Sequence, residues 1–204
     1  MSFEEALKTN QSLFDLDLDA VTLSRLSAYY SLLTRWNARL HLVAPCSPEE
    51  FAIRHVLESL MLLKHLPPNA KIADIGSGAG LPIIPCLIAR ADLHATLIES
   101  SQKKSVFLRE AAKQLGLNSI VIPKPFEEIA APSVSFVTCR ALDRFVEKVP
   151  EILRWAPRGS SLLLFGGETV REKLSKATQA FKIPLSDRRF LFVITDHTDK
   201  ENPD

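Results

Sequence analysis

The sequence predicts an α/β domain with a doubly wound, mainly parallel β-sheet, preceded by an N-terminal helical cap. Three observations support this fold class. From Lys71 onward, short apolar runs alternate with helical segments of roughly 10–15 residues, as parallel strands and their crossovers do. A glycine-rich turn follows the first apolar run, and before Lys71 the apolar residues recur at helical spacing. We therefore expect a helical cap at residues 1–66 and a sheet domain at residues 67–204.

The composition indicates one globular protein without a strong overall charge. Hydrophobic residues make up 46% of the 204 residues, enough for a packed core, and the net charge of +1 gives no global field that favours nucleic acid or an anionic membrane. The three cysteines are far apart and odd in number, so neither a disulfide framework nor a zinc knuckle is expected. The N-terminus is acidic and polar, and no apolar run approaches the roughly 18 residues of a spanning helix. We expect a cytoplasmic monomer with no metal and no membrane contact.

Two helices are predicted in the cap. Asp19 can cap the first, which runs from Ala20 to about Leu42, and its apolar residues recur at helical spacing. The second lies in SPEEFAIRHVLESLMLLKHLPP, residues 47–68. It begins with a capping serine, a proline at the first helical position and a glutamate that completes a capping box, and the paired prolines end it.

The sheet domain alternates strands and helices in the order of a wound sheet. Strands are predicted at 71–75, 94–100, 119–123, 133–139, 160–167 and 188–195. Helices are predicted at 81–92, 101–116, 143–156 and 168–181, with a short turn or helix at 125–130. Pro150 is expected to bend or break the third of these helices.

The glycine turn GSGAG at residues 76–80 marks the expected ligand site. In open parallel sheets, ligands bind outside the carboxyl ends of the strands, where the strand order reverses. Glycines let the backbone turn sharply and let a ligand approach without a Cβ in the way. The residues expected to bind a cofactor here are Gly76, Ser77, Gly78, Gly80 and Leu81.

The spacing of this turn narrows the choice of ligand. A dinucleotide turn would read GxGxxG, but Leu81 stands where its third glycine would be, and no Lys-Ser/Thr pair follows to make a P-loop. Glu99 ends the second strand, where a carboxylate can accept hydrogen bonds from both hydroxyls of a ribose. S-adenosylmethionine fits this pattern, with its ribose on Glu99 and its amino-acid tail over the turn. In the alternative, the glycines only shape a turn and Glu99 is a solvated charge.

Three later positions belong to the same crevice. Phe126 and Glu127 follow the third strand, where an adenine would lie, although Phe126 could equally be an ordinary core residue. Arg140 ends the fourth strand, and a charge that finishes an apolar strand at the crevice is a functional candidate. Its alternative role is a surface salt bridge.

These motifs resemble the small-subunit ribosomal RNA guanine-N7 methyltransferases called RsmG, formerly glucose-inhibited division protein B. The resemblance runs from about Tyr29 to Val193 and rests on LLTRWNARLHL, RHVLESL, IADIGSGAGLPIIP, LIESSQKKSVFL, FEEI and TCRAL. It implies the class I S-adenosylmethionine-dependent methyltransferase fold, with residues 67–204 as the cofactor-binding domain. It also implies that Gly76, Gly78, Leu81, Glu99, Phe126, Glu127 and Arg140 contact or frame the cofactor.

The resemblance further implies ribosomal RNA, or the small ribosomal subunit, as partner and methyl transfer to guanine N7 of 16S ribosomal RNA as activity. Arg54 and His55 would lie near the RNA-facing mouth. Guanine N7 carries a free lone pair, so no general base is required. The candidate catalytic residues are His55 and Arg140, and we assign Arg140 to positioning through a contact to guanine O6, a phosphate or the tail of the cofactor. His55 could instead serve as an interhelix hydrogen-bond partner.

Three departures from the family pattern leave other functions open. His41 stands where the family has an NLT run, Pro125 where it has an arginine, and Phe165 where it has a lysine. A catalytically weak or inactive binding module, or a methyltransferase for small molecules, would be consistent with these changes. Basic residues also cluster in the helix at 101–116, where they form either phosphate contacts or a solvated face.

Overall fold

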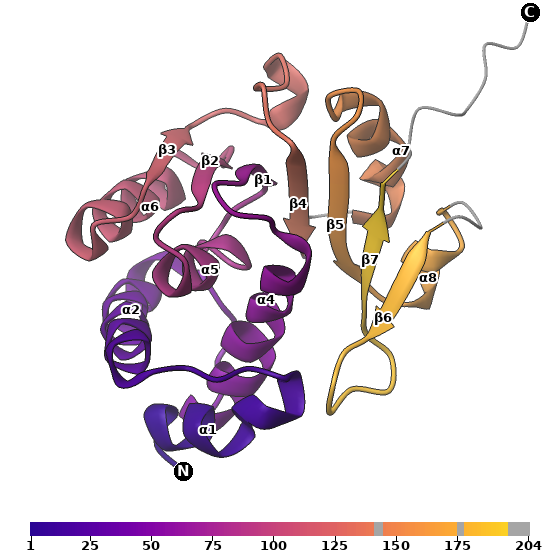
Figure 1. Ribbon diagram of the computed structural model, residues 1–204. Coiled ribbons are helices and arrows are strands. Elements are labelled where there is room, and N and C mark those ends of the chain that lie inside the picture. The colour runs from indigo at the N-terminus through magenta and orange to yellow at the C-terminus, as the bar shows by residue number, and fades with distance from the viewer. Residues whose placement is uncertain (141–144, 175–177, 196–204) are drawn as a thin grey trace, which may run out of the picture.

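A computed structural model describes residues 1–140, 145–174 and 178–195. Its centre is a seven-stranded sheet in the order β3-β2-β1-β4-β5-β7-β6 (Figure 1). The first five strands in sequence pair in parallel, whereas β7 is antiparallel to both β5 and β6. The strands are β1 (Lys71–Ile75), β2 (His94–Ile98), β3 (Ser119–Ile122), β4 (Phe136–Arg140), β5 (Ser161–Gly166), β6 (Gln179–Lys182) and β7 (Phe190–Ile194). The predicted doubly wound, mainly parallel sheet is confirmed, and its order reverses between β1 and β4.

The helices lie on both faces of this sheet, and the N-terminal ones also lie beside the carboxyl ends of the parallel strands (Figure 1). The N-terminal elements are α1 (Phe3–Asn10), η1 (Gln11–Phe14), α2 (Ala20–Leu40), α3 (Pro48–Phe51), the π-helical η2 (Ala52–Leu57), α4 (Glu58–Leu60) and η3 (Met61–His65). The sheet domain adds α5 (Ile83–Ala89), α6 (Gln102–Leu115), η4 (Phe126–Glu128), α7 (Phe145–Trp155) and α8 (Glu168–Arg171).

The predicted helix starts follow from local capping chemistry. The side chain of Asp19 accepts a hydrogen bond from the Thr22 N–H at 2.7 Å and begins α2. Ser47 accepts one from the Glu50 N–H at 3.0 Å and begins α3. The Glu50 carboxylate pairs with Arg54 instead of returning to the Ser47 backbone, so the expected capping box is only half formed.

The expectation for residues 168–181 is wrong. The helix α8 is a single turn, residues 175–177 lie outside the described ranges, and Gln179–Lys182 forms the edge strand β6. Pairing with β7 supplies the backbone hydrogen bonds that a helix would have supplied, and Phe181 lies 4.8 Å from the ring of His65. Tertiary pairing therefore overrides a helical sequence pattern here.

Of the bend or break expected at Pro150, the break does not occur, and the bend stays a prediction. This proline lies inside α7, which the structure describes as one helix from Phe145 to Trp155. The predicted start of this helix at Asp143 lies outside the described residues. The helix still packs its apolar face, since Val149 and Ile152 are fully buried.

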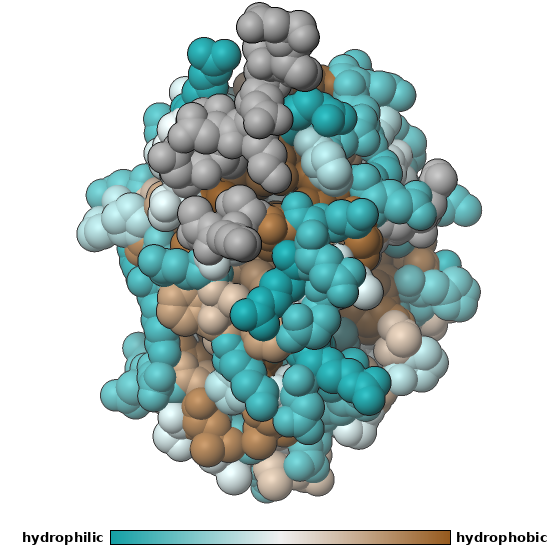
Figure 2. All heavy atoms as spheres, turned by 90° about the vertical axis from the view of Figure 1, so that its right-hand side faces the viewer, coloured by the Kyte–Doolittle hydropathy of each residue, from teal (hydrophilic) through white to brown (hydrophobic). Residues whose placement is uncertain are grey.

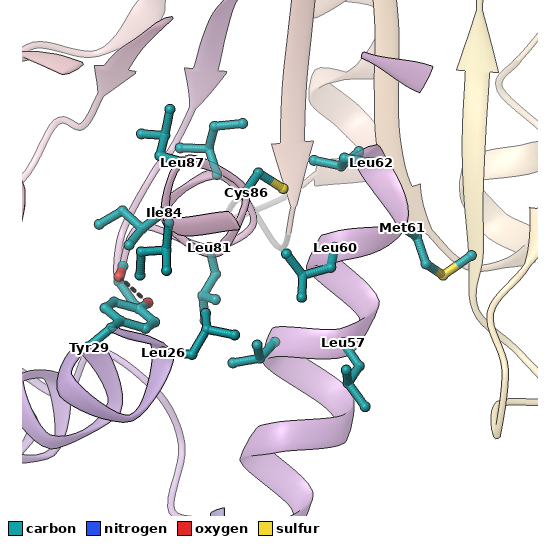
Figure 3. Close-up of a cluster of buried hydrophobic side chains, with 14 of the residues drawn as sticks. Leu26, Tyr29, Leu57, Leu60, Met61, Leu62, Leu81, Ile84, Cys86 and Leu87 are labelled. Atoms are coloured by element: carbon teal, nitrogen blue, oxygen red, sulfur yellow. Dashed lines mark hydrogen bonds between the residues drawn. The ribbon is translucent and has the colours of Figure 1, made fainter. Parts of the chain in front are cut away.

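Alternating strand residues enter two hydrophobic cores on the two faces of the sheet. Ile72 and Leu163 belong to the first core, whereas Ala73 and Leu164 belong to the second. The N-terminal helices, α5 and α6 cover the first face, and η4, α7 and α8 cover the second. The first core is continuous from cap residues such as Leu57 to the sheet, so the cap packs directly against the sheet (Figure 3). The domain division at residue 66 stays a prediction.

The β6 edge is mostly hydrophilic. All four β6 residues are exposed, and Figure 2, which faces this side of the molecule, shows hydrophilic residues over most of it with separate hydrophobic patches between them. None of the described helices combines the length and apolar character that crossing a membrane requires.

Candidate functional site

A cleft of about 730 Å³ opens at the carboxyl ends of the central strands. Its walls are the turn after β1, the residues that end β2, β4 and β5, one face of η2 and α4, and the β6–β7 hairpin. The predicted residues that line it are Gly76, Ser77, Gly78, Leu81, Glu99, Arg140 and His55. The topological switch between β1 and β4 therefore carries the site, as expected for this class of sheet.

The glycine turn is held in a left-handed backbone conformation. Gly78 has φ of +52°, which favours glycine, and a Cβ there would meet no atom closer than 3.7 Å, so the backbone faces open space. Gly80 has φ of +84°, and a Cβ there would lie 2.2 Å from Cδ1 of Ile84. Gly80 therefore lets the turn pack closely against Ile84 and does not line the cleft, whereas the Gly78 backbone lines the cleft.

A buried tyrosine of the helical cap fixes the same turn. The Tyr29 hydroxyl donates to the Ala79 carbonyl at 2.8 Å, and the side chain is fully buried (Figure 3). Burial raises the pKa of Tyr29, so the hydroxyl keeps its proton and remains a donor. The cap thus contributes directly to the geometry of the ligand turn.

Glu99 joins the turn to the start of α6. One of its carboxylate oxygens accepts from the Gly78 N–H and the other from the Ser101 N–H, both at 2.8 Å. The residue is only 6% exposed, yet it lines the cleft. Its carboxylate therefore has a fixed orientation before any ligand arrives.

Asp74 is a buried acid behind the turn that sequence reasoning did not select. Its Oδ1 accepts from the Thr138 hydroxyl at 2.7 Å, and its Oδ2 has no hydrogen-bond partner among the described residues. Burial raises the pKa of Asp74 to about 7, against the hydrogen bond from Thr138, which lowers it. A proton on Oδ2 would make this oxygen a donor at neutral pH.

The pKa of Asp74 predicts a pH-dependent gain from the substitution Asp74→Asn. The folded pKa is raised, so wild type loses stability as pH rises from about 4 to about 7, and the loss then levels off. Asparagine resembles the protonated acid and has no such loss. We expect Asp74→Asn to unfold at higher urea than wild type at pH 7, with the difference vanishing near pH 4. A constant difference across that range would contradict the assignment.

Arg140 is held in place by four groups from three segments. Its Nη2 donates to the Arg54 carbonyl and to Glu58 Oε2 at 3.2 Å, and its Nη1 donates to the Ser59 hydroxyl at 3.4 Å. The guanidinium carbon lies 5.3 Å from the centre of the Phe165 ring. The side chain is 13% exposed, so Arg140 is a largely buried, oriented donor and not a surface salt bridge.

Glu58 is the buried counter-charge of this cluster, and it was missed. It is 1% exposed, and its second oxygen lies 2.8 Å from a guanidinium nitrogen of Arg189, an ion pair without hydrogen-bond geometry. The pKa of Glu58 is raised overall, because burial outweighs the opposing effect of Arg140, Arg189 and Arg54. Two guanidiniums at this range favour the ionised carboxylate, which therefore bridges β4 and the β6–β7 hairpin.

His55 lines the cleft as a neutral imidazole. Its ring packs against Phe51 with centres 5.0 Å apart. Burial, together with Arg140 and Arg54, lowers the pKa of His55 to about 4. In the neutral form one ring nitrogen donates and the other accepts, so His55 can contact a base but carries no charge to offer a phosphate at neutral pH.

Phe126 and Glu127 lie apart from the cleft lining. Phe126 is 3% exposed and packs edge-on against Trp155, in the core on the other face of the sheet. Glu127 forms an ion pair with Lys148, whose ammonium also lies over the Phe126 ring. Their role in binding an adenine stays a prediction.

Two of the missed residues left a signal in the sequence and one did not. Glu58 is an acid within the apolar stretch VLESLMLL, and Asp74 is an acid inside an apolar strand, which are the settings of a buried charge. Arg189 gave no signal, because the hairpin that carries it was not predicted.

Known proteins resemble this chain in sequence. A family model described as rRNA small subunit methyltransferase G, GidB, matches residues 22–198. The chain is 35% identical over 166 residues to a protein of Halorhodospira halophila named ribosomal RNA small subunit methyltransferase G, covering 81% of this chain and 79% of that protein. It is 36% identical over 186 residues to the protein of the same name from Sorangium cellulosum, covering 87% and 76%.

The fold also has solved counterparts. An RNA methyltransferase from Salinibacter ruber, in complex with S-adenosyl-L-homocysteine, matches with a TM-score of 0.57 over 79% of this chain and 98% of that one, at 16% identity. At this identity the likeness concerns the fold, which is the predicted class I methyltransferase fold.

Proposed function

Because the chain belongs to the ribosomal RNA small subunit methyltransferase G family, as the sequence resemblance predicted, we propose that it transfers a methyl group from S-adenosylmethionine to guanine N7 of 16S ribosomal RNA. One arrangement supports this most directly. Glu99 and Gly78 are hydrogen-bonded to each other, and both line the same cleft as Arg140. A cofactor site and a substrate-positioning group thus share one space.

The residues on the turn side fit S-adenosylmethionine. Glu99 supplies a carboxylate for ribose hydroxyls, and Gly78 supplies backbone without a side chain. Asp74 lies directly behind the turn with an oxygen that has no described partner. Gly76, Gly78 and Glu99 are the residues that would hold the cofactor, with Leu81 as an apolar contact.

The chemistry needs alignment and not proton transfer. When bound, S-adenosylmethionine supplies a methyl group attached to a positively charged sulfur. Guanine N7 is a free acceptor, so no residue has to remove a proton from it. The chain has to bind both partners in line and exclude water, and alignment alone can contribute roughly 7–11 kcal/mol. The neutral state of His55 is consistent with a role in contacting the base.

Arg140 is suited to positioning the target nucleotide. A bidentate contact to guanine O6 and N7 would cover the reacting nitrogen. Its bonds to Glu58, Ser59 and the Arg54 carbonyl already fix the guanidinium plane. Arg140 would therefore contact O6 alone, or a phosphate, with its remaining donors.

The two alternative functions have less support. Phe165, where the family has a lysine, lies 5% exposed beneath the Arg140 guanidinium and therefore supports the arginine cluster. His41 is an exposed residue that ends α2 in a left-handed conformation, and Pro125 precedes η4. Neither of these two lies in the cleft lining, so their departures leave the described site intact.

Methyl incorporation tests the proposed activity. Small ribosomal subunits from a strain lacking the modification, and rRNA stripped from them, are incubated with the protein and methyl-labelled S-adenosylmethionine. We expect one 7-methylguanosine per small subunit by nucleoside mass analysis. Cofactor binding with unlabelled subunits and unlabelled rRNA would overturn the RNA assignment.

Glu99→Ala is expected to weaken S-adenosylmethionine binding tenfold or more. Hydrogen bonds to a charged group contribute about 1.5–3 kcal/mol, and the Gly78 N–H also loses its acceptor. Calorimetric titration gives the dissociation constant. Glu110→Ala, on α6 and outside the cleft lining, is the control and should bind as wild type does. Equal affinities for wild type and Glu99→Ala would remove Glu99 from the cofactor site.

A further inference from the structure

Two packed helices concentrate the positive charge of this nearly neutral protein. The α2 helix contains three arginines and no acid, and α6 contains four basic residues and one acid, Glu110, in a chain whose net charge is only +1. The Glu110 carboxylate accepts a hydrogen bond from Gln114, a neighbour on its own helix. Sequence alone showed only the α6 half of this cluster, and packing adds the α2 half.

The packing brings cations of the two helices side by side at one end of the pair. The Trp36 and Phe107 rings are 5.9 Å apart, and the Arg25 guanidinium donates to the Leu115 carbonyl at 2.9 Å. These two contacts make the helices antiparallel, so the end of α2 lies beside the start of α6 (Figure 1). Arg39 is one helical turn after Trp36, and Lys103 is one turn before Phe107, so both lie at the same height.

Most of these cations are exposed, and the described structure gives them no acidic partners. Arg25 is used internally, because its guanidinium binds two backbone carbonyls. None of the remaining six takes part in an ion pair among the described residues. We call them the α2–α6 basic face: Arg35, Arg39, Lys103, Lys104, Arg109 and Lys113.

The basic face is continuous with the catalytic cleft. Lys104 lines the cleft, and so do Leu42 and Val43, which directly follow α2. The Asn37 side chain holds this segment through two hydrogen bonds to the Val43 backbone, at 2.9 and 3.1 Å. A polyanion lying on the basic face would therefore enter the cleft beside the cofactor turn.

We propose that the α2–α6 basic face binds the phosphate backbone of ribosomal RNA flanking the target nucleotide, an inference that rests on the proposed function. Exposed cations that contact phosphates release counterions and give affinity that falls with salt and does not depend on sequence. The face supplies docking, and the cleft supplies selection of the base. Arg35 and Arg39 are thus docking residues that act outside the reacting centre.

The test compares two double variants with the same change in charge. Arg35→Gln with Arg39→Gln removes two cations from the face. Lys71→Gln with Arg158→Gln removes two exposed cations at the opposite, amino-terminal ends of the strands, where the described structure gives neither an ion pair. Deproteinised small-subunit rRNA is the probe, in direct titrations and in methyl-transfer assays, with cofactor affinity and thermal melting as checks on folding.

We expect the α2 variant to lose about tenfold in RNA affinity near 0.1 M salt and to show a salt slope shallower by about two. Its KM for RNA should rise likewise, with kcat and cofactor affinity unchanged. Equal RNA affinity for the two double variants would overturn the proposal. If wild type methylates neither this RNA nor the assembled small subunit, the proposed function fails, and the titrations still decide whether the face binds RNA.

Discussion

Arg140→Lys is expected to reduce methyl transfer by about 100-fold or more while leaving cofactor affinity nearly unchanged. A preorganised donor in a water-excluded site typically contributes that much to turnover, and lysine cannot reproduce the planar fork that Glu58, Ser59 and the Arg54 carbonyl fix. The measurement is single-turnover methylation of saturating small-subunit rRNA. Lysine keeps the charge beside Glu58, so the melting temperature should stay close to that of wild type.

Arg140→Ala separates the structural part of this effect. It removes one of the two guanidiniums on a carboxylate that is 1% exposed, so turnover should fall as for lysine and some stability should be lost as well. Wild-type turnover in the lysine variant would show that Arg140 is only a partner for Glu58 and does not position the substrate.

Glu58→Ala is expected to have the largest effect on stability, a loss of about 3–5 kcal/mol in the free energy of unfolding. The substitution leaves the guanidinium of Arg140 without its carboxylate partner. It also removes the ion pair that ties Arg189, in the β6–β7 hairpin, to α4. Urea unfolding, followed by circular dichroism, gives the free energy. Turnover should fall too, because Arg140 would no longer be held in one orientation.

A matched ion pair on the surface provides the control for Glu58. Asp15 pairs with Lys64 at 2.6 Å, but both side chains are exposed, and asparagine tolerates the φ of +53° at this position, so Asp15→Asn should cost at most about 1 kcal/mol. Glu58→Gln keeps the shape of the side chain and removes only its charge. If Glu58→Gln is as stable as Asp15→Asn and fully active, the buried carboxylate does not organise the two arginines.

The order of strands and helices could be predicted because each element depends mainly on residues close together in the sequence. Strands such as β1 and β2 are short apolar runs, and helix starts such as Asp19 and Ser47 have capping side chains that bond within three residues. The glycine turn is equally local, because its backbone conformation needs glycine at Gly78 and Gly80 whatever surrounds them. β6 escaped prediction, since its pairing partner β7 lies beyond its own segment.

The candidate site was predictable only in part, for the same reason. Glu99 and Arg140 end predicted strands, so the rule for parallel sheets placed them at one edge. The cap residues that complete the cleft could not be placed, because no periodicity links Tyr29 to Ala79 across 50 positions or Glu58 to Arg140 across 82.

By itself, the sequence determined the family, the wound sheet, the glycine turn with its carboxylate, and the cofactor class these imply, since each depends on short-range pattern. Tertiary structure alone decided that Glu58 joins Arg140 to Arg189, and that α2 and α6 pool their cations beside the cleft. The interaction between two charges depends on their distance in space, and the number of residues between them in the sequence does not give that distance.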